Sequence, residues 1–252
     1  MLIFLTMVIT GVLIGFTGAG GAGTIIAILT SLFGVPVHLA LGTSLFSMIF
    51  TSLSGTISHF KENNVMLKIG SFTGLFGALG AFIGAHLASN IDENILKILT
   101  ATMMFFSSIL LWLKLFTNNR IWSTIHSKTK KTFLNFIFKV LLIGLITGSL
   151  SGLLGIGAAP FIQIGILSCF GLTARQAAGT TMLIIIPIAF VGGVGYYTLG
   201  NLNFILFLKV VTGTMIGSFI GAKFTAYANE LFLKAAMITI PIIAGFLLIF
   251  GN

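Results

Sequence analysis

Six apolar segments, each long enough to cross a lipid bilayer, constrain this chain more than any other feature. They cover residues 37–57, 69–88, 95–113, 176–197, 204–222 and 232–250. A helix of about 20 apolar residues spans the hydrocarbon core of a membrane. With 57% hydrophobic and only 7% charged residues, the chain carries more apolar surface than a soluble domain can bury. The sequence therefore predicts an all-α polytopic membrane protein.

Two longer apolar stretches, 1–34 and 133–171, are interrupted by glycine. The interruptions read GFTGAGGAG, residues 15–23, and GSLSGLLGIGAAP, residues 148–160. Glycine weakens a helix interior by about 1 kcal/mol relative to alanine. Non-helical backbone at membrane depth is tolerated only where protein covers it or where it lines a wet cavity. We therefore predict broken or re-entrant helices that restart after Gly23 and after Pro160, with seven or eight membrane segments in all. Close helix packing alone is the alternative.

The interrupted stretches belong to an internal duplication with an offset of 137 residues. Of the 87 positions in 11–97, 24 are identical after this shift, where the composition alone gives about 8 or 9. The sequence thus predicts a first membrane repeat, 1–113, a basic cytoplasmic linker, 114–132, and a second membrane repeat, 133–252. The glycine pairs of GAFIGA (80–85) and GSFIGA (217–222) are typical of close contacts between helices.

The distribution of lysine and arginine separates two topologies, because cations concentrate on the cytoplasmic side of a membrane. If every apolar stretch crosses once, the repeats are parallel, and nine cations lie inside and four outside. If 1–34 and 133–171 each return to the side they came from, the repeats are inverted, and the split is eleven to two. The charges favour the inverted arrangement. The length of 133–154, which suffices for a full span, argues against it.

The polar residues favour an anion over a cation as the ligand. All four acidic residues fall at predicted span ends, namely Glu62, Asp92, Glu93 and Glu230. A restarting helix presents free N–H groups and the positive end of its dipole, which attract anions. Hydroxyl and amide groups near the interruptions can donate hydrogen bonds to oxyanion oxygens, namely Thr17, Thr24, Thr43, Ser44, Gln163, Thr180 and Thr181. Bonding of Thr43 and Thr180 back to their own helices is the alternative.

Two cationic positions and the remaining histidines complete the candidates. His38 and Arg175 are paired by the 137-residue offset and begin two predicted helices, where a positive charge opposes the dipole and suggests a bound anion. Anchoring at the cytoplasmic surface is the alternative for Arg175. We expect His59, His86 and His126 at membrane interfaces.

Several functional classes do not fit. The formal charge of +9 is spread over loops and forms no dense basic face, so we expect no nucleic-acid partner. The single cysteine, scattered histidines and peripheral acids predict no metal site, no cofactor and no catalytic constellation. Membrane lipid and a small anion are the expected partners, and we expect no enzyme.

These motifs resemble the sulfite exporter TauE/SafE family of membrane permeases. The resemblance covers nearly the whole chain and rests on the two glycine-rich openings, each followed by AxGT[ST], here ALGTS (40–44) and AAGTT (177–181). It implies that matching positions form the substrate site, namely Gly18, Gly20, Gly21, Gly42, Thr43, Ser44, Gly155, Gly157, Gly179, Thr180 and Thr181. The sequence departs from the family at GIGAAP, where the family commonly has GIGGG before a proline. We expect the side chains of Ala158 and Ala159 to narrow the space in which a ligand can approach the backbone.

The resemblance implies a secondary transporter that exports sulfite, an organosulfonate or a related small oxyanion across the bacterial cytoplasmic membrane. Alternating access around a midplane site between the two broken segments is the expected mechanism. An anion channel on the same scaffold and a non-transporting scaffold or sensor are the alternatives. Homodimers are common among such permeases, so a homodimer is one expectation for the assembly.

Overall fold

The computed structural model describes residues 2–18, 21–88, 91–116, 133–155, 158–198, 200 and 202–251, which form α-helices and short connections without a strand. In chain order the helices are α1 (Leu2–Thr17), α2 (Ala22–Phe33), α3 (Val37–Lys61), α4 (Leu67–Ala88), α5 (Glu93–Phe116), α7 (Phe133–Leu154), α8 (Ala159–Phe170), α9 (Ala174–Thr198), α10 (Phe204–Tyr227) and α11 (Glu230–Phe250). Seven of these are long and apolar enough to cross a membrane. The predicted all-α polytopic fold is confirmed.

Both glycine-rich interruptions break a helix. α1 ends at Thr17 and α2 begins at Ala22, while α7 ends at Leu154 and α8 begins at Ala159. The chain leaves helical geometry through glycines with positive φ, 64° at Gly18 and 63° at Gly155. The helices restart at Ala22 and Ala159, so our expected starts after Gly23 and Pro160 were two residues late.

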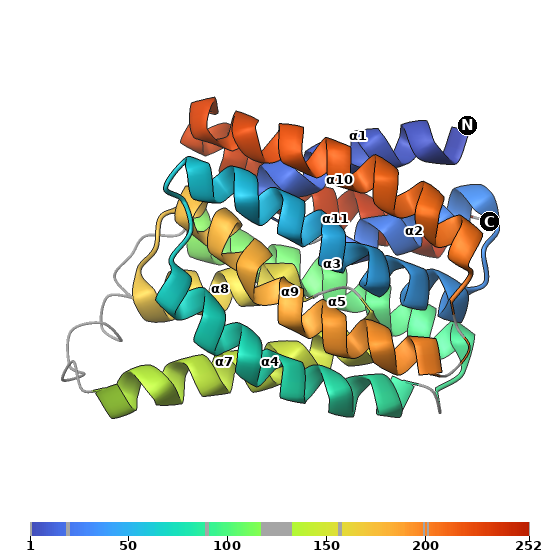
Figure 1. The fold of residues 1–252 in the computed structure, drawn as a ribbon, viewed down its shortest axis with the longest axis horizontal. Helices are drawn as coiled ribbons and strands as arrows, with labels where there is room; N and C mark the ends of the chain where they lie inside the picture. The colour runs from blue at the N-terminus through green and yellow to red at the C-terminus, as the bar shows by residue number, and fades with distance from the viewer. Residues whose placement is uncertain are drawn as a thin grey trace.

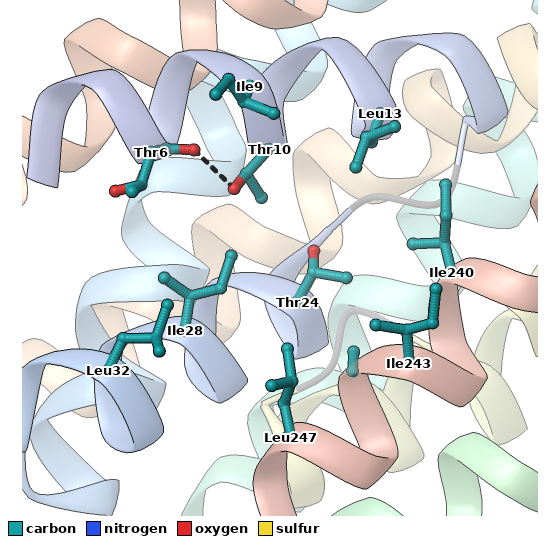
Figure 2. A pocket seen from close by; sticks show the side chains of 11 residues that line it. Thr6, Ile9, Thr10, Leu13, Thr24, Ile28, Leu32, Ile240, Ile243 and Leu247 are labelled. Atoms are coloured by element: carbon teal, nitrogen blue, oxygen red, sulfur yellow. Dashed lines mark hydrogen bonds between the residues drawn. The ribbon is translucent and has the colours of Figure 1, made fainter. Parts of the chain in front are cut away.

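Each broken pair forms a hairpin. Residues Thr6 and Leu32, near the start of α1 and the end of α2, line the same groove (Figure 2). In the second hairpin, Lys139 near the start of α7 donates from Nζ to the Cys169 carbonyl near the end of α8, at 3.2 Å. The chain therefore leaves each hairpin at the end of the bundle where it entered. This geometry fits the inverted alternative, although α7, with 22 residues, is also long enough for a full span.

The helix bounds and contacts agree with the proposed duplication. The bounds of α2 and α3 become those of α8 and α9 when 137 is added to each number. The two most extensive helix pairs, α4 with α7 and α1 with α10, also exchange under this offset, as do α4 with α9 and α10 with α3. Every major contact therefore joins one half to the other. Both chain ends lie at the same edge of the bundle (Figure 1).

Glycine allows backbones to meet across these pairs. A β-carbon at Gly84 of α4 would overlap the Ser149 backbone of α7, and one at Gly221 of α10 would overlap the Val12 backbone of α1. Every buried residue of α4 is Gly, Ala or Thr, whereas its exposed side chains include Leu75, Leu79 and Phe82. Small residues inside and large apolar residues outside are typical of helices that pack within lipid. The predicted close-packing role of the GxxxG pairs is confirmed.

Candidate functional site at the two helix breaks

The end of α1 inside the protein is capped by side chains from three other helices. The bonds are His59 Nε2 to Gly15 O at 3.0 Å, Thr225 Oγ1 to Phe16 O at 2.7 Å and Gln163 Nε2 to Thr17 O at 2.9 Å. The last carbonyls of a helix have no partner within it, and an unpaired buried carbonyl is costly. These three donors, from α3, α10 and α8, allow the helix to stop at this depth.

The end of α7 is capped in a related way. Tyr196 donates its hydroxyl to Gly152 O at 3.3 Å, and Thr100 donates to Leu154 O at 3.3 Å. Tyr196 and Gly152 are the counterparts of His59 and Gly15 under the 137-residue offset. Our expectation that His59 lies at a membrane interface was wrong, because its side chain is fully buried against α1. Two equivalent positions thus cap two equivalent carbonyls, with different chemistry.

Each break meets the AxGT[ST] motif of the other half. A β-carbon at Gly18 would overlap the backbone of Ala178, which directly precedes Gly179. A β-carbon at Gly155 would overlap the side chain of Leu41, which directly precedes Gly42. The structure therefore brings the motifs together across the two repeats.

The hydroxyls of these motifs have different surroundings. Ser44 donates to its own helix, at Leu41 O, 2.9 Å away. Thr180 accepts from the Met66 N–H at 3.0 Å, so it holds the start of α4 and does not bond back to α9. The hydroxyls of Thr43 and Thr181 are buried and have no partner among the described residues. Back-bonding, the alternative for Thr43 and Thr180, is found at neither.

A small cavity of about 20 Å³ lies between the starts of α2 and α8. Its lining residues are Gly21, Gly23, Thr24, Met104, Ser107, Pro160, Ile240 and Pro241. Gly23 pairs with Pro160, and Met104 with Pro241, under the 137-residue offset, so each half contributes two residues at equivalent positions. The residues that precede the two helices, Gly21 and Ala158, make no side-chain cap. Among the described residues, no side chain accepts from the first N–H groups of either helix next to this cavity, and Pro160 itself has no N–H.

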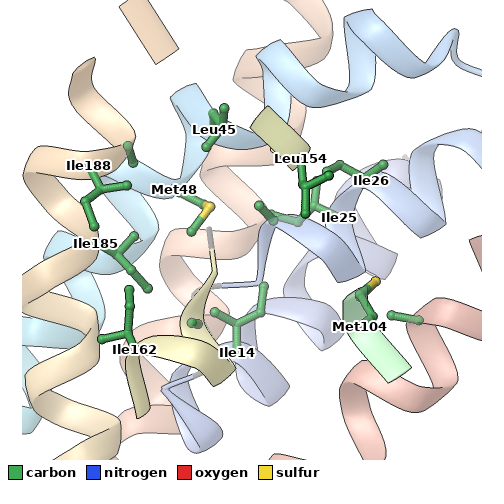
Figure 3. Packing of buried hydrophobic residues seen from close by; sticks show 14 of the residues in the cluster. Ile14, Ile25, Ile26, Leu45, Met48, Met104, Leu154, Ile162, Ile185 and Ile188 are labelled. Atoms are coloured by element: carbon green, nitrogen blue, oxygen red, sulfur yellow. The ribbon is translucent and has the colours of Figure 1, made fainter. Parts of the chain in front are cut away.

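Apolar packing closes the region around the breaks. Figure 3 shows side chains from α1, α2, α3, α8 and α9 in contact there, including Ile14, Ile25, Met48, Ile162 and Ile185, all fully buried. A volume of about 20 Å³ suffices for roughly one water-sized sphere. An oxyanion of four or five heavy atoms needs more space, so the structure describes a closed arrangement of this site.

A larger groove of about 260 Å³ lies beside the cavity (Figure 2). It runs between α1, α2 and α11 and shares Thr24 and Ile240 with the cavity. The Thr6 and Thr10 hydroxyls on its wall donate to carbonyls of α1, which leaves an apolar lining. Exposed side chains such as Ile9 and Ile243 form its outer edge, so the groove opens to the membrane.

The remaining predicted residues lie apart from the cavity, or outside the described part of the chain. His38 begins α3, and its buried Nδ1 has no partner among the described residues. Arg175 donates from Nη2 to Ala228 O at 2.8 Å, where its charge suits the C-terminal end of α10. Of the predicted glycines, Gly20 and Gly157 lie outside the described residues.

Four cavity residues on α5 and α11 were not predicted, namely Met104, Ser107, Ile240 and Pro241. Pro241 lies inside an apolar helix, and its pairing with Met104 under the offset was the available signal. Nothing in the spacing indicated that α5 and α11 contact each other, which the structure shows.

The fold and the site together define a class of protein. Membrane-length helices surround two broken pairs, and the starts of α2 and α8 meet between two halves whose helix bounds agree with the proposed duplication. This is the architecture of helical membrane transporters built from repeats.

The chain belongs to the sulfite exporter TauE/SafE family, whose sequence profile matches residues 3–248. It is 47% identical over 250 residues to the probable membrane transporter protein YdhB of Bacillus subtilis, covering 99% of this chain and 100% of the relative. It is 24% identical to YjnA of the same organism, covering 98% of each chain, and 28% identical to MJ0441 of Methanocaldococcus jannaschii, covering 80% and 74%. Both are also described as probable membrane transporter proteins. No solved structure matches significantly.

Proposed function

We propose that this protein is a secondary transporter that exports a small oxyanion, such as sulfite or an organosulfonate, across the bacterial cytoplasmic membrane. The family supports transport as the activity. The observation that carries the choice of an anion is the cavity between the starts of α2 and α8, where two helix N-terminal ends converge. Free N–H groups at such ends bind anions without a cationic side chain.

The buried polar groups around the breaks support the same ligand. The hydroxyls of Thr43 and Thr181 are donors without a partner among the described residues. An anion that enters when the site opens can accept from these hydroxyls and from the N–H groups at the two helix starts. The membrane potential, worth about 2.3 kcal/mol per charge per 100 mV, drives an anion outward when the inside is negative.

The closed cavity requires a conformational change in each transport cycle. The apolar side chains around the breaks exclude the substrate in the arrangement described here (Figure 3). In our proposal the pairs α1–α10 and α4–α7, each with one helix from either half, rock against each other as rigid units and expose the cavity to alternate sides. Their close backbone contacts favour rigid-body movement over bending.

Flux measurements in proteoliposomes test the proposal. Purified protein is reconstituted and assayed with labelled sulfite, sulfate, thiosulfate, methanesulfonate and acetate. We expect saturable flux of at least one sulfur oxyanion, accelerated by the same anion on the opposite side. Flux that neither saturates nor responds to anion on the opposite side identifies a channel, and absence of flux for every anion rejects transport of this class.

Two threonines of α2 provide a matched pair of variants. Thr24 lines the cavity and donates to Gly21 O at 2.7 Å, whereas Thr30 donates to Ile26 O at 2.8 Å and does not line it. A hydrogen bond to a charged group contributes about 1.5–3 kcal/mol, so Thr24→Val is expected to lower anion flux about 10- to 100-fold. Thr30→Val is expected to stay within about twofold of the wild type, because it removes the same local bond elsewhere. Equal effects of the two variants contradict the proposed site.

A further inference from the structure

The two breaks differ in one capping residue, and only one of the two is of a type whose free side chain changes its charge near neutral pH. His59 bonds to Gly15 O, and at the equivalent position Tyr196 bonds to Gly152 O. Histidine is the side chain whose unperturbed charge changes between about pH 5 and 8, whereas tyrosine stays neutral there. The duplicated scaffold therefore carries a titratable cap at one break and a non-titratable cap at the other.

The bonding of the His59 ring fixes where its protons can lie. A carbonyl oxygen only accepts, so Nε2 must donate its hydrogen to Gly15 O. Nδ1 is then an unprotonated acceptor, and it is buried without a partner among the described residues. The side chain as a whole is fully buried. One nitrogen thus holds the break together, while the other is an acceptor that can take a proton once water reaches it.

At the end of the bundle where α3 finishes, the charged groups of the helices packed against α3 are mostly cations. α3 packs against α1 and α2, which carry no titratable side chain, and against α5, α9 and α10. At this end of the bundle these helices bring Lys114, Arg175 and Lys223, beside Lys61 and Glu62 of the same connection. Arg175 binds Ala228 O, and the Lys61 ammonium lies 5.6 Å from the centre of the Phe219 ring. In such surroundings an imidazolium becomes more stable when an anion arrives.

We propose that His59 is a proton-binding site that couples proton movement to anion transport. The inference rests on the proposed function. When the first break opens to solvent, Nδ1 takes a proton from water, while Nε2–H still donates to Gly15 O. The imidazolium carries one positive charge at the C-terminal end of α1, where the helix dipole favours it, and across the break from the starts of the anion-binding helices. Proton and anion then move in the same direction and largely cancel each other's charge, so the anion's concentration gradient drives export in place of the membrane potential, which acts only on an anion that moves alone.

Thermodynamic linkage between proton and anion binding gives the sign of the pH effect on anion binding. If anion binding favours proton binding, protonation must favour anion binding equally. Lowering the pH therefore strengthens anion binding, by up to about tenfold per pH unit when one proton accompanies each anion. Glutamine at position 59 can still donate to Gly15 O but cannot take a proton in this range.

The experiment compares the wild type, His59→Gln and Tyr196→Phe in proteoliposomes. The probe is labelled methanesulfonate, whose charge does not change between about pH 5 and 8, together with a pH-sensitive dye for proton movement. In the wild type we expect one proton per anion and flux that rises as the pH falls. His59→Gln should carry methanesulfonate without protons and without pH dependence. Tyr196→Phe removes the other cap. Whatever its overall flux, this variant should keep the ratio of one proton per anion and the rise of flux as the pH falls.

Specific outcomes overturn the proposal. An unchanged pH profile and proton flux in His59→Gln do so directly. If the wild type carries no methanesulfonate, or if His59→Gln fails to fold, nitrogen NMR of histidine-labelled wild type, which has only four histidines, decides independently of transport. A His59 signal that titrates, and titrates at higher pH with methanesulfonate present, supports the proton site even where export is disproved. A His59 ring that stays neutral down to about pH 5 in both conditions rejects it.

Discussion

Ala158 occupies a backbone conformation that glycine ordinarily takes. Its φ is 43°, in the left-handed region, and its counterpart under the 137-residue offset is Gly21 with φ 74°. For an L-residue this region costs about 1–2 kcal/mol. The sequence marked this residue as a departure from the family pattern, but only the structure shows that its backbone is strained. The strain lies at the start of α8, beside the candidate site.

We predict that Ala158→Gly stabilises the protein by about 0.5–1 kcal/mol, because relief of the strain exceeds the extra flexibility that glycine gives the unfolded chain. The reverse change, Gly21→Ala, should destabilise it, since its new β-carbon also overlaps the Ile14 side chain. Thermal or denaturant unfolding in detergent measures both. A lower stability of Ala158→Gly would mean that the left-handed geometry carries no strain.

At the scale of helices, the sequence predicted most of what periodicity and glycine content can reveal. The predictions of two helix breaks and of close-packed GxxxG faces are confirmed. The observed helices exceed the predicted spans by up to five residues, as at Tyr227 of α10. The capping network was not predictable, because a histidine two residues before Lys61 looks like an interfacial residue. Its burial depends on which helix packs against the last turn of α3. The position of Met104 and Pro241 on one cavity depends on tertiary packing in the same way.

Helix pairing gives a prediction of its own. A β-carbon at Gly221 would lie 2.8 Å from the Val12 carbonyl carbon and 2.9 Å from the Phe16 nitrogen, and backbone atoms cannot move aside as a flexible side chain can. Gly221→Ala should therefore separate α10 from α1 and destabilise the protein by about 1–3 kcal/mol. The control is Gly192→Ala on α9, where the nearest atom, Leu45 Cδ1, is 3.6 Å away. This control should retain or gain stability, because alanine is the better helix former. Equal melting temperatures for the two variants contradict the packing argument.

At the scale of the whole molecule, the orientation of the two halves decides how the protein can work. Inverted halves exchange roles when they rock, so one site can open to either side of the membrane. The hairpin shape of both broken pairs fits this arrangement, and so does the bias of cations toward the ends of α3 and α10 and the starts of α4, α9 and α11. Parallel halves would place corresponding loops on one side and offer no such exchange.

Two corresponding loop residues separate the alternatives by cysteine labelling. Pro36 and Thr173 differ by 137 in number, lie in the connections after α2 and α8, and are both exposed. In a background with Cys169→Ser, inverted repeats place a cysteine at position 36 outside the cell and one at position 173 inside, whereas parallel repeats place both outside. We expect a membrane-impermeant maleimide to label Pro36→Cys in intact cells and to label Thr173→Cys only after permeabilisation. If both label equally in intact cells, the two halves are parallel, and exchange between inverted halves cannot be the basis of transport.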